Sequence, residues 1–233
     1  MDGLAEIRRA EAYSHTEAYT NHELFADGSW LAKPVKTVLD LFPLFADYRE
    51  LRCLDLGSGV GRNSIPVARA FAEIDCRVDC VDILALAIDK LREYARRFGV
   101  EDRLRGIVSS IDDYEIPPAQ YDLILAISAL EHVCSEEVLE RKLVEMRDGV
   151  RQGGVVCLIM NTGIEERDKV SGAILRPQFE VNMDTGALQR ILQQTFTDWH
   201  VIKHGVRHQK YEIPRGHGVS ELETDVVTWV VRK

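Results

Sequence analysis

The sequence predicts a single α/β domain built on a doubly wound, largely parallel sheet. Short β-branched runs alternate with longer amphipathic stretches through the middle of the chain, which is the pattern of strands joined by crossover helices. The first of these strands runs into a glycine-rich turn and then a helix. A chain of 233 residues, 45% hydrophobic and 29% charged, has ordinary globular composition, and one core is enough for it.

The central part of the chain repeats one unit, a strand followed by a crossover, and such crossovers are right-handed. The expected strands are residues 51–56, 77–82, 103–108, 121–127 and 154–160, and the expected helices are residues 61–72, 84–98 and 136–150. Before them, residues 31–48 are expected to form one amphipathic helix.

The pattern changes after Asn161. Residues 162–179 are polar and are expected to form a loop. The next expected elements are a helix over 183–194, which starts at Asp184 and Thr185, strands over 199–203 and 224–231, and a long connection over 204–223. A connection of that length is usually functional or disordered.

No linker or internal repeat divides the chain, so residues 1–233 are expected to form one domain. Within it we distinguish an N-terminal, lid-like segment (1–30), a ligand-binding core (31–160) and a C-terminal, substrate-side part (161–233).

Charge and composition exclude several function classes. The formal net charge of −9 opposes binding to nucleic acid or anionic lipid, and no apolar run approaches the length of a membrane span. The first residues contain no apolar targeting segment, so a cytoplasmic location is expected. Five cysteines without a C-x-x-C pair are expected to be reduced and mostly buried, and no metal-binding spacing is present.

The most informative segment is the glycine-rich turn that contains Gly57, Gly59 and Gly61. Glycines there let the backbone turn tightly and approach a ligand, while the following helix presents free N–H groups. A dinucleotide-binding turn would need its third glycine at position 62, which is Arg62. Asp55, just before the turn, would repel a pyrophosphate and suits a ligand with an ammonium group. A nucleotide-like cofactor other than NAD is therefore indicated.

A second acidic residue stands at the end of the next strand. Asp82 follows Gly61 by 21 residues, where a carboxylate accepts hydrogen bonds from ribose hydroxyls. Ile83 beside it is placed to cover an adenine face.

In combination, these motifs resemble the class I S-adenosylmethionine-dependent methyltransferases over about residues 31–160. The resemblance rests on Asp55 to Gly61, on Asp82 and on the fourth-strand segment 121–126. It implies a Rossmann-like sheet of seven strands, mostly parallel with an antiparallel C-terminal strand, and S-adenosyl-L-methionine as the cofactor. Residues 59–64 and the compact C-terminal hairpin are also similar to the TehB-like tellurite-resistance methyltransferases.

The family pattern places the glycines along the methionine part of the cofactor, Asp55 at its amino end and Asp82 at its ribose. Either Ser110 or Asp112 would bind the adenine amine, and both alternatives stay open. The stretch from Ala126 to Ser128 would line the cofactor's exposed face. The residues expected to bind the cofactor are Asp55, Gly57, Ser58, Gly59, Gly61, Asn63, Asp82, Ile83, Ser110, Ile111, Asp112 and Ala126.

Methyl transfer from a sulfonium depends mainly on proximity and orientation, and a base is needed only when the attacking atom carries a proton. His132, after the fourth strand, is a candidate base or anion-binding group, although it can equally be a packing residue. A front cluster, too irregularly spaced for one helical stripe, suggests either a lid or ordinary packing: Tyr13, His15, Tyr19, His22, Phe25 and Trp30. A cationic cluster lies between the last strands, with His208 and Arg215 as catalytic candidates: His204, Arg207, His208, Lys210, Arg215 and His217.

These observations predict a methyltransferase acting on a small molecule. A cationic cluster facing a sulfonium fits an anionic acceptor such as an oxyanion or a thiol-like compound. The alternative is a protein that binds S-adenosylmethionine without transferring its methyl group, as a sensor or partner subunit. An NAD-dependent oxidoreductase is disfavoured by Arg62 and Asp55. A monomer and a homodimer are both compatible with the sequence.

Overall fold

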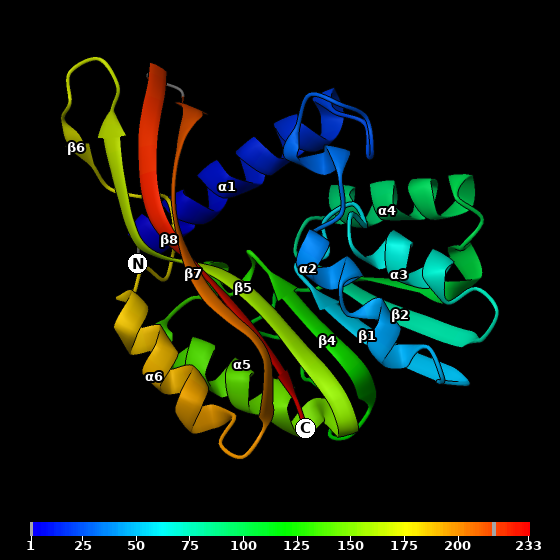
Figure 1. The fold of residues 1–233 in the computed structure, drawn as a ribbon. Helices are drawn as coiled ribbons and strands as arrows, with labels where there is room; N and C mark the ends of the chain where they lie inside the picture. Colours follow the sequence, from blue (N-terminus) through cyan, green and yellow to red (C-terminus); the bar gives the residue numbers. More distant parts are fainter. Residues whose placement is uncertain (1, 216–217) are drawn as a thin grey trace.

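The computed structural model describes residues 2–215 and 218–233 and contains a mixed sheet between two layers of helices (Figure 1). The strands are β1 (Glu50–Leu56), β2 (Asp75–Asp82), β3 (Leu104–Val108), β4 (Tyr121–Ile127), β5 (Val150–Asp168), β6 (Ile174–Leu175), β7 (His200–Arg215) and β8 (Gly218–Arg232). The helices are α1 (Asp2–Asn21), α2 (Lys36–Leu39), α3 (Ser64–Ala70), α4 (Ala85–Arg97), α5 (Glu136–Gly149) and α6 (Thr185–Thr195).

The strand order confirms the predicted doubly wound sheet. It runs β3-β2-β1-β4-β5-β8-β7, with the short β6 paired to β5. The strands from β1 to β5 are parallel, and β8 is antiparallel to both β5 and β7. The chain proceeds outward from β1 to β3 and then returns to β4 beside β1, so the order reverses between β1 and β4. Ligands of open α/β sheets bind at the carboxyl ends of the strands at such a reversal.

Helices cover both faces of the sheet, and each face has its own core. Leu51 and Cys53 of β1 belong to the core beneath α3 and α4, whereas Leu54 and Leu56 belong to the core beneath α5 and α6. A strand buried on both faces has an unbroken apolar sequence instead of an alternating one. That is why the central strands were recognisable as short continuous runs.

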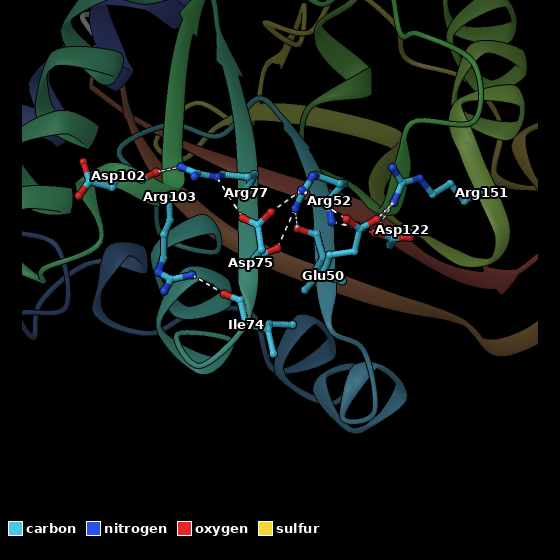
Figure 2. A network of polar contacts seen from close by, with 10 residues as sticks. Glu50, Arg52, Ile74, Asp75, Arg77, Asp102, Arg103, Asp122 and Arg151 are labelled. Carbon is cyan, nitrogen blue, oxygen red and sulfur yellow. Dashed lines mark hydrogen bonds and ion pairs between the residues drawn. The ribbon is translucent and has the colours of Figure 1, made fainter.

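The amino-terminal ends of the strands carry a network of ion pairs, shown in Figure 2. Arg52 binds Asp75 at 2.6 Å, and Arg151 binds Glu50 at 3.0 Å. The backbone N–H of Arg52 donates to Asp122 at 2.8 Å. These charged groups are paired with one another, so we assign them a structural role. The opposite edge, at the carboxyl ends, is the place to look for a ligand.

The single helix predicted over residues 31–48 is wrong. This segment contains a 3₁₀ turn at Trp30–Ala32, the one-turn helix α2 and a second 3₁₀ turn at Phe42–Phe45. Pro34 and Pro43 lie within it. Proline lacks an N–H donor and moves the residue before it out of the helical region, so the amphipathic pattern is broken into separate turns.

The expected long connection over 204–223 is also wrong, because its described residues, 204–215 and 218–223, belong to the paired strands β7 and β8. Lys210 on β7 forms ion pairs with Glu221 and Glu223 of β8, at 2.5 and 2.8 Å. Polar cross-strand pairs can hold a solvated hairpin together, and they leave no alternation of apolar residues in the sequence. The expected loop over 162–179 is shortened as well, since β5 continues to Asp168.

Two other expectations are confirmed. Asp184 caps α6, because its side chain accepts a hydrogen bond from the backbone N–H of Ala187 at 3.0 Å. All five cysteines are free, and all except Cys134 are buried. Within the described part of the chain, no helix has the length and apolar character needed to cross a membrane.

Candidate cofactor and acceptor site

A cavity of about 300 Å³ lies at the carboxyl ends of the parallel strands, where the strand order reverses. Its walls come from α1, from the turns after β1 to β4, and from the segment before α6. The lining residues are Arg8, Glu11, Ala12, His15, Tyr19, Gly57, Asp82, Ile83, Leu84, Ser110, Ile111, Asp112, Ser128, Ala129, His132 and Glu180. Its volume lies at the lower end of the range for small-molecule sites.

Helix α1 contributes one face to this cavity. Arg8, Ala12, His15 and Tyr19 follow the three- and four-residue spacing that places side chains on the same side of a helix. This face is not formed by the front cluster as a whole, whose six residues were expected to be too irregularly spaced for one helical stripe. Of the six residues in the front cluster, His15 and Tyr19 line the cavity, whereas Tyr13 is 68% exposed.

The glycine turn has the tight, left-handed backbone that its glycines allow. Gly57, Gly59 and Gly61 have φ angles of 69°, 54° and 93°, in the left-handed region. A Cβ on Gly57 would come within 2.6 Å of the Ala129 side chain, and one on Gly59 within 2.8 Å of the Tyr19 hydroxyl. The absence of side chains therefore lets both the segment after β4 and helix α1 approach the turn.

Asp82 connects the glycine turn to the cavity wall. One carboxylate oxygen accepts the backbone N–H of Gly59 at 2.8 Å, and the other accepts the N–H of Leu84 at 2.9 Å. Burial raises the pKa of Asp82, and the two N–H donors act against this rise. A carboxylate oxygen can accept a second hydrogen bond, so both oxygens can still bind a pair of hydroxyls in the cavity.

Asp55 does not line the cavity. It is 1% exposed, and its carboxylate accepts a hydrogen bond from the Ser64 hydroxyl at 2.5 Å. Burial, together with the nearby charge of Asp82, raises the pKa of Asp55 to about 7. Its expected role beside a cofactor ammonium group stays a prediction.

The expected adenine end of the cavity contains Ser110, Ile111 and Asp112. The Ser110 hydroxyl donates to Asp113 at 2.6 Å, and Asp112 is paired with Arg8 of α1. Both candidates for the adenine amine therefore have partners already, and the structure leaves the choice between them open. Ile83 is 53% exposed on the same wall, as a residue covering a planar ring would be.

The remaining residues expected at the cofactor support the turn from behind. Gly59 and Gly61, with Ser58, Asn63 and Ala126, are not among the cavity-lining residues. Asn63 accepts the backbone N–H of Val35 at 3.0 Å, which ties the turn to the segment before α2. The buried Ser58 hydroxyl has no hydrogen-bond partner among the described residues, and it is available to one that a ligand would bring.

His132 also lies on the cavity wall. Its Nδ1 is 3.0 Å from a carboxylate oxygen of Glu180, and its ring stacks on Phe179 with centroids 5.3 Å apart. Burial disfavours the imidazolium, but the hydrogen bond to Glu180 and the charges of Glu131 and Glu11 outweigh it and raise the pKa of His132 to about 9. His132 is therefore a cation at neutral pH.

The other two catalytic candidates lie outside the cavity lining. His208 pairs with Asp225 at 3.1 Å and is 65% exposed. Arg215 is buried and holds Glu166 with two hydrogen bonds, of 2.8 and 3.0 Å. Within the C-terminal cationic cluster, His208, Lys210 and Arg215 are thus paired locally, and His217 lies outside the described residues. Roles for His208 and Arg215 toward an acceptor stay predictions.

Sequence reasoning missed three charged cavity residues, Arg8, Glu11 and Glu180. The spacing of the first two from His15 carried a usable signal, because these residues repeat at helical intervals. Glu180 carried none, since it lies in a segment without a motif. Among the described residues, no group of three or more His, Cys, Asp or Glu side chains has the geometry of a metal site.

The arrangement fits S-adenosyl-L-methionine. The glycine turn allows close approach, Asp82 offers a carboxylate for a ribose, Ile83 offers an apolar face, and Ser58 has a hydroxyl without a partner. When bound, this cofactor supplies an electrophilic methyl group on a positively charged sulfur.

Comparison with known proteins agrees with this geometry. A family model described as "Methyltransferase domain" matches residues 53–154, whereas no curated protein sequence matches the chain significantly. TehB from Haemophilus influenzae has a similar structure, with a TM-score of 0.63 and 17% identity over 85% of this chain, which spans 62% of the TehB chain.

Two further structures extend the comparison. A SAM-dependent methyltransferase from Methanosarcina mazei has a TM-score of 0.57 at 16% identity, covering 82% of this chain and 97% of its own. The 1,6-didemethyltoxoflavin-N1-methyltransferase of Burkholderia thailandensis, solved with 1,6-didemethyltoxoflavin and S-adenosylhomocysteine bound, has a TM-score of 0.56 at 17% identity, covering 98% and 89%. Residues 53–154 thus match a methyltransferase domain, and the strand order of the sheet is that of the class I S-adenosylmethionine-dependent methyltransferase fold.

Proposed function

We propose that the protein transfers the methyl group of S-adenosylmethionine to a small molecule bound between α1 and His132. The observation that carries this proposal is the cavity itself, which is lined both by Asp82 and by the His132–Glu180 pair. An acceptor beside His132 would share one enclosed space with a cofactor beside Asp82.

The residues of this chain contribute position and enclosure. The glycine turn and Asp82 would fix the cofactor, and the α1 face that carries His15 and Tyr19 covers the cavity. Orientation of two reactants in one site accounts for much of the rate of a displacement reaction.

We propose an anionic acceptor, an oxyanion or a thiolate, with His132 as its binding group. The His132 Nδ1 is bonded to Glu180, whereas no described residue is hydrogen-bonded to its Nε2. A protonated ring therefore has one N–H left for an acceptor atom, and an anionic nucleophile needs no base. This support replaces the C-terminal cationic cluster, whose charges are largely paired with neighbouring carboxylates.

The His132→Gln variant tests this role. We expect kcat/KM for an anionic acceptor to fall by about 10- to 100-fold, because a charge-assisted hydrogen bond is lost. Affinity for S-adenosylhomocysteine should change little, since the His132 side chain is hydrogen-bonded to Glu180 and not to Asp82 or the glycine turn. Steady-state rates with selenite, tellurite and a small thiol would measure the first effect, and calorimetry the second.

The pH dependence of the parent enzyme separates the two roles of His132. As an anion-binding cation it works while protonated, so kcat/KM for selenite should decline as the pH rises through about 9. As a general base for a protic acceptor it would work only when neutral, and the rate would rise over the same range. A rising profile would therefore favour an alcohol, phenol or amine acceptor.

The first experiment is calorimetric titration with S-adenosylmethionine and S-adenosylhomocysteine, followed by an acceptor screen. Micromolar binding with methyl transfer supports the proposal. Tight binding without transfer to any acceptor class would support a sensor or partner subunit instead. Absence of binding to either compound would overturn both.

A further inference from the structure

We propose that Glu180 is a positioning residue that orients His132 and fastens α1 over the cavity. The inference rests on the proposed function and assigns a role to a residue that no sequence motif marks. The Glu180 side chain is 2% exposed, and its two carboxylate oxygens face two different parts of the protein. One lies 3.0 Å from Nδ1 of His132, and the other lies 3.5 Å from Nε of Arg8 on α1.

The segment that carries Glu180 is built around His132. Phe179 stacks on the imidazole ring with an interplanar angle of 25°, and the backbone N–H of Val181 donates to the carbonyl of Glu131 at 2.9 Å. Three consecutive residues thus contact the turn that contains His132, through a ring, a carboxylate and the main chain. The contacts of the two neighbouring residues hold the backbone on both sides of Glu180, and they thereby fix the direction of its carboxylate.

Burial makes the two cationic partners necessary. A carboxylate removed from water is costly unless its charge is paired and its oxygens are hydrogen-bonded. Glu180 meets this requirement only while His132 and Arg8 are both in place. The free-energy cost of burying the Glu180 charge therefore depends on His132, in the proposed acceptor site, and on Arg8, which α1 holds in position.

The pairing also determines which nitrogen of His132 is available. With Nδ1 bonded to a carboxylate, Nε2 is the nitrogen left for a ligand, and the ring cannot rotate without losing the bond. Glu180 thus sets the orientation of His132 toward an acceptor without touching the acceptor itself.

Arg8 extends the effect to the cover of the cavity. Besides Glu180, it pairs with Asp112 on the adenine side. One α1 side chain therefore bridges two walls of the cavity, and it anchors the helix whose residues close the site. Removal of Glu180 should loosen α1 at its amino-terminal half.

The test compares Glu180→Gln and Arg8→Met with matched controls, all without cofactor. Glu165→Gln removes an exposed carboxylate that pairs with Arg167, and Arg9→Met removes the neighbouring arginine of α1, which has no carboxylate partner among the described residues. Nuclear magnetic resonance follows the titration of His132, and amide hydrogen exchange follows α1.

Glu180→Gln should lower the pKa of His132 by about one unit or more, because the adjacent negative charge is removed. Other charged groups around the ring remain: Glu131 beside it in sequence, Glu11 on α1, and Asp82 at the end of β2. Both Glu180→Gln and Arg8→Met should speed exchange in α1 by about tenfold or more, because the first removes one ionic contact of Arg8 and the second removes two. Only Glu180→Gln should lower the His132 pKa. The controls Glu165→Gln and Arg9→Met should change neither the His132 pKa nor the exchange of α1.

An unchanged His132 titration in Glu180→Gln would overturn the positioning role. Unchanged exchange of α1 in Arg8→Met, which lies on a helix surface and preserves the core, would overturn the fastening role even if Glu180→Gln failed to fold. Because both readouts are made without cofactor, they are independent of the proposed function. Failure of S-adenosylhomocysteine to bind the parent protein would end the methyltransferase proposal and leave these results intact.

Discussion

Asp82→Ala should lose at least about 100-fold in affinity for S-adenosylmethionine and S-adenosylhomocysteine, because two hydrogen bonds to a charged acceptor disappear. The residue has two tasks that both affect the cofactor. Its carboxylate faces the cavity, and it also accepts the backbone N–H groups of Gly59 and Leu84. The variant would therefore lose both a ligand contact and the support of the glycine turn.

Isothermal titration calorimetry measures this loss, with Asp89→Ala as the control. Asp89 carries the same charge on the exposed side of α4 and interacts there with Arg92. The Asp89→Ala variant should bind both compounds with the affinity of the parent protein. Retention of affinity within about threefold in Asp82→Ala would place the cofactor elsewhere, since a direct charged contact contributes more than that.

Asp55→Asn should be more stable than the parent at pH 8, and the advantage should shrink toward pH 4.5. The folded state raises the pKa of this buried carboxyl to about 7, above its value near 3.9 in an unfolded chain. The folded protein thus binds a proton more tightly, and the parent loses stability as the pH rises from about 4 through 7. Asparagine keeps the shape without the charge, and the Ser64 hydroxyl can rotate to suit it.

The difference in advantage between the two pH values has a ceiling of about 3 kcal/mol, at about 1.4 kcal/mol per unit of pKa. Urea unfolding at pH 4.5 and pH 8 would measure it. Asp75→Asn is the control of opposite sign, because hydrogen bonding to Arg52 lowers the pKa of the exposed Asp75. That variant should lose stability at pH 8 relative to its parent. An Asp55→Asn advantage independent of pH would contradict the assignment.

The parts of the fold that sequence predicted are those with local signals. The strand before the glycine turn is an apolar run, the turn is marked by Gly57 and Gly59, and Asp82 stands at a fixed spacing behind them. Each of these features is specified by residues close together in the chain. The expected role of these residues at the cofactor follows from their own chemistry, because glycines allow close approach and a carboxylate accepts hydrogen bonds from ribose hydroxyls.

The parts that sequence did not predict depend on contacts between distant segments. The β7–β8 hairpin is held by pairs such as Lys210 with Glu223, so its residues look like a solvated loop until their partners are known. Glu180 is important only because folding brings it to His132 and to Arg8, 48 and 172 residues away along the chain. Pro34 and Pro43 are a local signal against a single helix over residues 31–48, and they outweigh the amphipathic pattern around them.

The order of the strands has a consequence for synthesis. β8 lies between β5 and β7, so the long strand β5 has no partner on that side until β8 has left the ribosome. The half of the sheet that carries the glycine turn and Asp82 needs only residues that emerge earlier, as far as β5. An unpaired strand edge is a site for aggregation. A nascent chain should therefore bring together Asp82 and the glycine turn while the β5 edge that later pairs with β8 is still exposed. A chaperone that prevents aggregation at this stage would have to cover β5.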